Sequence, residues 1–172
     1  IRVIDLTQQP ASPQFVRTVA GGHTGGGTCG GIAHPYCNDG TGINAQFSFP
    51  YGLALNDAHH LLYVADTANH RIRRIDLASV PVTTLAGGHI GGGTCGGLAS
   101  STCNDGQGND AQFISPLDIT DDTSSGDIFV IDANNQRIRR VTATGAVTTF
   151  AGGNAGNGVT CSGSNNAHCK DG

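Results

Sequence analysis

The sequence predicts an all-β fold made of tandem repeats. The stretch Leu61 to Asp76, LLYVADTANHRIRRID, returns as Asp127 to Thr142, DIFVIDANNQRIRRVT, at an offset of 66 positions. Glycine accounts for 27 of the 172 residues, and glycine is unfavourable inside helices. No segment keeps apolar residues at the helical spacing i, i+3, i+4, i+7 for three turns. A repeated unit of this kind sets the architecture before any local assignment does.

The repeat divides the chain into four parts. Residues 1–19 resemble the last two strands of a repeat, with strands expected at 1–6 and 15–19. A full repeat follows at 20–85 with a cysteine loop at 20–43, and another at 86–150 with a cysteine loop at 86–109. Residues 151–172 begin a further repeat. We expect a window of a longer repeat protein, and because the chain contains no Met, we do not expect Ile1 to be a translational start.

The sequence of each full repeat predicts four short antiparallel strands. These runs are rich in β-branched and aromatic residues and are separated by short polar turns. In the first repeat they cover 51–55, 61–65, 71–77 and 80–86; in the second they cover 117–120, 127–131, 137–141 and 146–151. Four short antiparallel strands per repeat are typical of a propeller blade.

The six cysteines recur in pairs of identical spacing. An even number at regular positions predicts local disulfides and an oxidising compartment. Such cross-links would also explain how a connection of more than 20 residues is held inside a compact unit. The predicted pairs are Cys29 with Cys37, Cys95 with Cys103, and Cys161 with Cys169.

A recurring motif resembles the NHL-repeat β-propellers. The pattern DGxGxxAxFxxP runs from Asp39 to Pro50 and again from Asp105 to Pro116. It is followed by LYVADxxNHRIRRI-like and VTTLAGG-like stretches in both copies. The resemblance implies a β-propeller or an open propeller-like array, with a period lengthened by the glycine-rich cysteine inserts. More loosely, such repeats resemble mastigoneme proteins of algae and protists, which build flagellar hair filaments.

The recurring polar and aromatic residues are expected to shape turns and to connect blades. Asp can accept turn amides and Asn tolerates positive φ, so a ligand role for Asp66 is the less favoured alternative. The Phe residues are expected to be core anchors, with ligand stacking as the alternative. The Arg residues are expected to pair with neighbours such as Asp66, Asp76 and Asp132 and to bury their aliphatic stems against the next blade, with phosphate or acidic-glycan binding as the alternative. The predicted turn residues are Asp66, Asn69, Asp132, Asn135, Asp39 and Asp105, and the predicted inter-blade residues are Arg71, Arg73, Arg137, Arg139, Phe47 and Phe113.

No metal or cofactor is predicted. His23 and His34 lie near Cys29 and Cys37, which raises a zinc site. However, position 34 becomes Ser100 in the next repeat, whereas the cysteines recur three times. Calcium at the Asp39 and Asp105 turns is the alternative, but one carboxylate per turn is few for calcium.

The sequence favours a structural role over catalysis. The net charge of −4 argues against a nucleic-acid surface, and no apolar run approaches the ~20 residues of a membrane span. There is no GxSxG or HExxH motif. His59, His60 and His70 do not recur as histidines, which disfavours a propeller lyase or hydrolase.

We therefore expect a non-catalytic extracellular or cell-surface protein that stacks on its own kind into a filament or scaffold. Its Thr83-Thr84 and Thr148-Thr149 pairs could carry O-glycans. A ligand- or protein-binding propeller module of a secreted receptor is the alternative.

Overall fold

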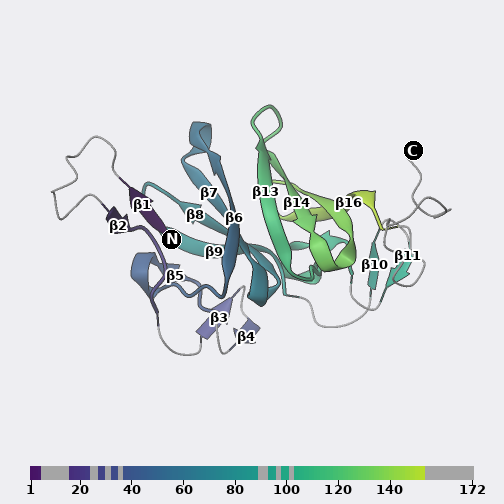
Figure 1. The fold of residues 1–172 in the computed structure, drawn as a ribbon, viewed down its shortest axis with the longest axis horizontal. Coiled ribbons are helices and arrows are strands. Elements are labelled where there is room, and N and C mark those ends of the chain that lie inside the picture. The colour runs from purple at the N-terminus through teal and green to yellow at the C-terminus, as the bar shows by residue number, and fades with distance from the viewer. Residues whose placement is uncertain are drawn as a thin grey trace, which may run out of the picture.

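The computed structural model describes residues 1–4, 16–23, 27–29, 32–34, 37–88, 93–95, 98–100 and 103–153. This part of the chain forms two five-stranded antiparallel sheets and three two-stranded ones (Figure 1). The predicted all-β, blade-like architecture is confirmed. No helix in the described residues is long and apolar enough to cross a membrane.

The first large sheet is built from the first full repeat. Its strand order is β5-β9-β8-β7-β6. The strands are β5 (Gly40–Thr41), β6 (Pro50–Asn56), β7 (Leu61–Asp66), β8 (Arg71–Asp76) and β9 (Pro81–Gly87).

The second large sheet repeats this order as β12-β16-β15-β14-β13. Its strands are β12 (Gly106–Gln107), β13 (Pro116–Asp122), β14 (Asp127–Asp132), β15 (Arg137–Val141) and β16 (Ala146–Gly152). All eight predicted blade strands are present, and each sheet gains a two-residue fifth strand at its outer edge. The fifth strands, β5 and β12, are too short for a pattern of alternating residues to reveal.

Two of the small sheets precede the first large sheet in the chain, and the third lies between the two large ones. They pair β1 (Arg2–Ile4) with β2 (Val16–Thr18), β3 (Gly27–Cys29) with β4 (Ile32–His34), and β10 (Gly93–Cys95) with β11 (Leu98–Ser100). The last two hairpins lie within the cysteine loops.

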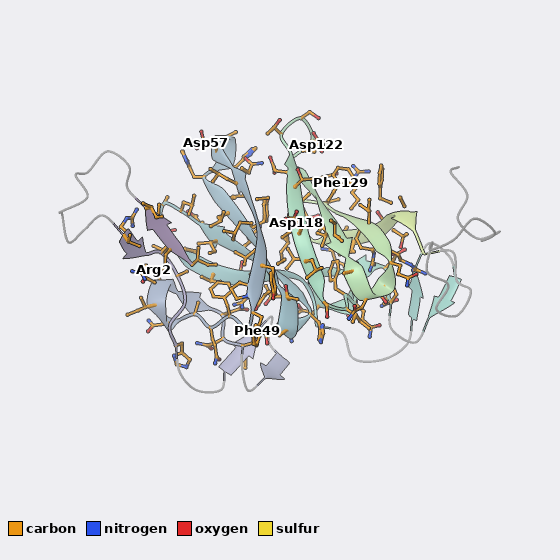
Figure 2. The ribbon with its side chains drawn as sticks, in the orientation of Figure 1. Arg2, Phe49, Asp57, Asp118, Asp122 and Phe129 are labelled. Atoms are coloured by element: carbon orange, nitrogen blue, oxygen red, sulfur yellow. The ribbon has the colours of Figure 1, made fainter. Side chains whose placement is uncertain are left out.

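Short 3-10 turns connect the main strands. They are η1 (Gly42–Asn44), η2 (Asp57–His59), η3 (Thr67–Asn69), η4 (Gly108–Asp110) and η5 (Ala133–Asn135). Asp57 and Asp122 mark the first hairpin turns at the same end of the two sheets (Figure 2).

The two large sheets lie side by side, with β6 next to β13 (Figure 1). Their backbones approach so closely that a Cβ at Gly52 would lie 2.6 Å from the Cα of Asp118. Asn56 Nδ2 donates to Asp121 Oδ1 at 3.0 Å across the same interface. This is the face-to-face arrangement of neighbouring blades.

Two apolar clusters fill the interfaces between successive units. The larger joins both sheets and contains Tyr63, Ala65 and Ile72 of the first with Phe113 and Val130 of the second. The smaller joins the first sheet to the N-terminal unit, through Val64, Ile75 and Val82 with Ile1 and Ala20. Alternate residues of β7 and β8 thus point to opposite clusters, as the period of two in a strand requires.

Candidate functional site

A buried arginine organises the first repeat. Arg73, on β8, is fully buried. Its Nη1 donates to Asp66 Oδ2 and to the carbonyl of Gln46, both at 2.9 Å. Its Nη2 donates to Asp39 Oδ1 at 2.8 Å and to the carbonyl of Asn38 at 3.0 Å. One guanidinium therefore joins the β7–β8 hairpin to the segment that precedes the sheet.

The second repeat contains the same arrangement around Arg139. Its Nη1 donates to Asp132 Oδ2 and to the carbonyl of Gln112, both at 2.9 Å. Its Nη2 donates to Asp105 Oδ1 at 2.7 Å and to the carbonyl of Asn104 at 3.0 Å. The pattern is thus a structural unit of the repeat, and we call each copy an arginine hub.

Each hub also reaches β9 or β16, the fourth main strand of its sheet. Thr84 Oγ1 donates to Asp39 Oδ1 at 3.1 Å, and Thr149 Oγ1 donates to Asp105 Oδ1 at the same distance. The two aspartates were expected to shape their own turns. Instead, their carboxylates bind the third and fourth strands and close the segment onto the sheet.

The expected pairing of the hub arginines with Asp66 and Asp132 is present in both hubs. The hub hydrogen bonds of Arg73 and Arg139 stay within the repeat and do not themselves connect blades. In β8, Arg71 and Arg73 share the face opposite to that of Ile72, which packs toward the second sheet. Arg74, also on β8, makes a hydrogen bond to the second repeat: its Nη1 donates to the carbonyl of Ala143 at 3.4 Å. Arg71 and Arg137 are buried on the same face as the hub arginines.

The hairpin turn between β7 and β8 also differs from the prediction. Positive φ falls on His70 (55°) and Gln136 (54°), one residue after Asn69 and Asn135. Asn69 instead donates from Nδ2 to Asp66 Oδ2 at 2.9 Å, and Asn135 does the same to Asp132. The left-handed residue is the one that directly follows the 3-10 turn. It is His in one repeat and Gln in the other, and neither residue type indicates a positive φ.

Asp66 is a fully bonded buried carboxylate. Its Oδ1 accepts the backbone N–H of Ser48 at 2.7 Å, and its Oδ2 accepts from Asn69 and Arg73. Burial raises the pKa of Asp66, while the hydrogen bonds from Asn69 and Ser48 and the charge of Arg73 act in the opposite direction. Asp132 is placed in the same way, with the pKa again raised by burial. Protein groups occupy both oxygens, which is the pattern of a structural carboxylate and not of a ligand site.

Each hub carries a phenylalanine on its guanidinium. Arg73 Cζ lies 5.0 Å from the ring centroid of Phe47, and Arg139 Cζ lies 5.1 Å from that of Phe113. These distances are within the range of cation–π interaction.

Each ring also lies against a glycine of the preceding unit. A Cβ at Gly21 would lie 3.1 Å from Phe47, and one at Gly87 would lie 3.0 Å from Phe113. Both phenylalanines thus contact the preceding unit, as expected for inter-blade residues.

The cysteines lie next to the hubs. Cys37 and Cys103 are buried and disulfide-bonded. Arg73 Nη1 lies 3.4 Å from Cys37 Sγ, and both Arg137 and Arg139 place Nη1 at 3.2 Å from Cys103 Sγ. The side chains of Cys29 and Cys95 are outside the described part of the structure, as are Cys161 and Cys169 entirely, so the pairings stay predictions.

Within the described residues, no three His, Cys, Asp or Glu side chains are grouped as metal ligands. The side chain of His34 lies outside those residues, so zinc around Cys29 and Cys37 stays the less favoured alternative.

A cavity lies on the face of the second sheet that points away from the first. Its volume is about 410 Å³. It is lined by Ile131, Ala133, Gln136, Arg137, Ile138, Ala151 and Gly152. Phe129 and Phe150 lie on the same sheet with their ring centroids 4.9 Å apart, edge to face (Figure 2 labels Phe129).

The sequence contained a signal for the hubs that composition alone does not reveal. Asp39, Phe47, Asp66 and Arg73 each recur 66 positions later, at constant mutual spacing. Four residues that keep one mutual spacing in both repeats indicate a single structural unit. What the sequence could not show is that backbone carbonyls, those of Asn38 and Gln46, supply two of the bonds.

Comparison with known proteins supports the same repeat. The NHL repeat family model matches residues 47–75, which run from the hub phenylalanine through β8. Protein SUPPRESSOR OF QUENCHING 1, chloroplastic, from Arabidopsis thaliana is 32% identical over 117 residues, which is 67% of this chain and 10% of that protein. NHL repeat-containing protein 2 from Homo sapiens is 35% identical over 102 residues, or 59% of this chain and 13% of that protein. The chain therefore spans roughly a tenth of the length of these relatives.

Solved structures from Bacteroides thetaiotaomicron are also similar. An auxiliary nutrient binding protein has a TM-score of 0.49 at 25% identity, with 72% of this chain and 28% of that chain covered. A structural genomics protein of unknown function has a TM-score of 0.46 at 21% identity, with 73% and 30% covered. With the matched repeat in the first sheet and its structural copy in the second, this chain belongs to the NHL-repeat proteins.

Proposed function

We propose that this chain is a non-catalytic structural module of an extracellular protein, which acts by packing its sheets against further protein surfaces of its own kind. The observation that carries the proposal is the arginine hub. In both repeats the hub arginine and one of its aspartates are fully buried, the second aspartate is partly buried, and all three are bonded together. The most regular polar chemistry of the sequence is therefore used to hold the repeat together.

The extracellular part of the proposal is supported by the cysteines. They recur in every repeat at one spacing, and the two whose side chains are described are bonded in disulfides. Disulfides form and persist mainly in oxidising compartments. The hubs depend on the cysteine loops, because the segment that holds Asn38 and Asp39 directly follows Cys37.

The scaffold role is supported by the arrangement of the sheets. Neighbouring units bury a shared apolar cluster, and a repeat protein gains stability from each such interface. The second sheet leaves the corresponding face exposed. The alternative is a protein-binding module of a secreted receptor. In that case the exposed face would bind a different protein and not another repeat.

Electron microscopy of native material tests the scaffold role. We expect filaments or a continuous wall layer in which the repeat is resolved, and glycosidase treatment should reduce the mass if the threonine pairs carry O-glycans. Discrete closed rings bound to an unrelated protein would contradict the scaffold and favour the receptor alternative.

Mass spectrometry tests the compartment. The native chain should gain about two mass units for each disulfide after reduction, because each bond takes up two hydrogen atoms. Free thiols at all six cysteines in native material would overturn the extracellular assignment.

A further inference from the structure

The sulfur of Cys103 lies beside two arginine side chains of the second repeat. It is 3.2 Å from Nη1 of Arg137 and 3.2 Å from Nη1 of Arg139. Cys103, Arg137 and Arg139 are all buried, with exposed fractions of 1%, 7% and 0%. Because Cys103 is disulfide-bonded, its sulfur is neutral and accepts only weakly from these N–H groups. Two buried cations therefore face a group that carries no charge while the disulfide is intact.

The two arginines differ in what balances their charge. Arg139 forms ion pairs with both aspartates of its hub, at 2.7 and 2.9 Å. Within the described part of the chain, Arg137 forms no ion pair; it donates to the carbonyl of Gly153 at 3.0 Å and to the Cys103 sulfur. Its Nε is also buried without an acceptor among those residues. Burial and the charge of Arg139 lower the pKa of Arg137, because both disfavour the cation.

Reduction of the disulfide would give this cation an anionic partner. A free cysteine has a pKa of about 8.5, and neighbouring arginines lower it because they stabilise the thiolate. Burial by itself acts in the opposite direction, since it disfavours a charged group. A Cys103 thiolate, however, would accept charge-assisted hydrogen bonds from two guanidinium groups, and such attractions are stronger in a buried site than in water. The reduced form of Cys103 is therefore expected to be the thiolate.

We propose that the Cys103 disulfide is a thiol–disulfide exchange site, in which Cys103 is the leaving thiolate and the substrate is an external dithiol. A thiol with a low pKa leaves faster in such an exchange, and a disulfide whose reduced form is stabilised is a stronger oxidant. The inference goes beyond the proposed structural role, because it assigns a reaction to a bond that would otherwise only cross-link the repeat.

Burial of Cys103 decides which sulfur is attacked. With 1% of Cys103 exposed, a dithiol from solution attacks the sulfur of its partner, which the sequence predicts to be Cys95. A mixed disulfide forms there, and the electron pair of the broken S–S bond leaves with Cys103. The second thiol of the dithiol then displaces Cys95, so the dithiol is oxidised to a disulfide by two electrons. Of its two thiol protons, one is taken up by Cys95 and the other is released to solvent.

The first repeat contains a second disulfide beside a hub. Cys37 is buried and disulfide-bonded, and its sulfur lies 3.4 Å from Nη1 of Arg73. This bond is in the same chain but in the other repeat. It therefore serves as an internal reference for any change made at Arg137.

A redox titration of the full chain tests the role of Arg137. Equilibration in mixtures of reduced and oxidised dithiothreitol, followed by alkylation and peptide mass spectrometry, gives the reduced fraction of each disulfide. Arg137→Met should lower the equilibrium constant for reduction of the Cys103 disulfide about tenfold, equivalent to about 30 mV for a two-electron couple. The constant for the Cys37 disulfide should stay unchanged. Arg17→Met, the same change at an exposed arginine, should alter neither.

A second measurement uses the unsubstituted chain and decides the matter if Arg137→Met does not fold. Cysteine isotopically labelled at Cβ reports by NMR the ionisation of each thiol in the fully reduced chain. The Cys103 signal should titrate below about pH 7, whereas an unperturbed thiol titrates near pH 8.5.

Three results would overturn the proposal. The first is an unchanged constant for the Cys103 disulfide in folded Arg137→Met. The second is an equal change at the Cys37 and Cys103 disulfides, which would assign the effect to the stability of the whole fold. The third is a Cys103 thiol that titrates at or above about pH 8.5 in the reduced chain.

Discussion

Ile72 and Ile138 occupy the same place in the two sheets, in the same Arg-Ile-Arg-Arg sequence. Ile72 is completely buried and Ile138 is 40% exposed. The hub arginines beside them, Arg73 and Arg139, are both fully buried and make the same bonds. The comparison separates two sets of contacts in the repeat: the hydrogen bonds of the hub and the apolar contacts of the sheet face. The hub is complete within one repeat, whereas the apolar face is completed by its neighbour.

The largest effect is expected at the hubs. Arg73→Met or Arg139→Met removes the partner of two aspartates and leaves Asp66 or Asp132 buried without its cation. Each change should cost about 3–5 kcal/mol of unfolding free energy, as for other broken buried ion pairs. Chemical denaturation followed by circular dichroism measures this, with the exposed Arg17→Ala as a control.

Equal losses at the two hubs would show that the hub is independent of coverage by a neighbour. A markedly smaller loss at Arg139 would break the comparison, because it would mean that the covered face contributes to the stability of the hub.

Phe113 and Phe47 are equivalent phenylalanines at two interfaces, and they differ in how deeply they are buried. Phe113 is 1% exposed between two complete sheets, and Phe113→Ala should cost about 3–5 kcal/mol. Phe47, which is only partly buried against the N-terminal unit, should cost less. Thermal unfolding of both variants decides the order; a larger loss at Phe47 would be inconsistent with the interface described here.

The isoleucines test the two faces directly. Ile72→Ala creates a cavity in the interface and should cost about 2–5 kcal/mol. Ile138→Ala removes a side chain that water already reaches and should cost about 1 kcal/mol or less. If the two losses were the same in the isolated chain, the face of the second sheet that contains Ile138 would have to be covered in solution.

The smallest effect concerns the first hairpin turns, which differ between the sheets. Asn56 accepts the N–H of His59 in one, whereas Asp122 accepts bonds from Ser124 and Ser125 in the other. Hydrogen bonds from the Ser124 and Ser125 hydroxyls and the Ser124 N–H lower the pKa of Asp122 from 3.8 to about 2.

A lowered carboxyl pKa in the folded state stabilises the protein above pH 3.8, and this contribution is lost as the pH falls toward 2. Carboxyl-carbon NMR should show Asp122 titrating near pH 2, and Ser124→Ala should move the pKa upward. An unchanged midpoint in Ser124→Ala would remove the assigned cause.

Much of the fold could be read from the sequence. The eight main strands lie within one or two residues of their predicted limits, since β-branched runs between polar turns are a local signal. The two-residue strands β5 and β12 could not be predicted, because they exist only by pairing with β9 and β16. For the site, the sequence indicated the pairing of the hub arginines with Asp66 and Asp132. It did not indicate that the same guanidinium groups bind Asp39 and Asp105 and backbone carbonyls of the preceding segment.

The sequence by itself determined the repeat, the strand pattern and the set of residues that recur with it, because side-chain alternation and turn chemistry act over a few positions. Only the tertiary structure decided which groups Arg73 binds, since its partners lie up to 36 positions away and include backbone carbonyls. Burial of Ile72 and exposure of Ile138 were likewise decided by packing. Identical local sequence cannot state whether a neighbouring sheet is present to exclude water.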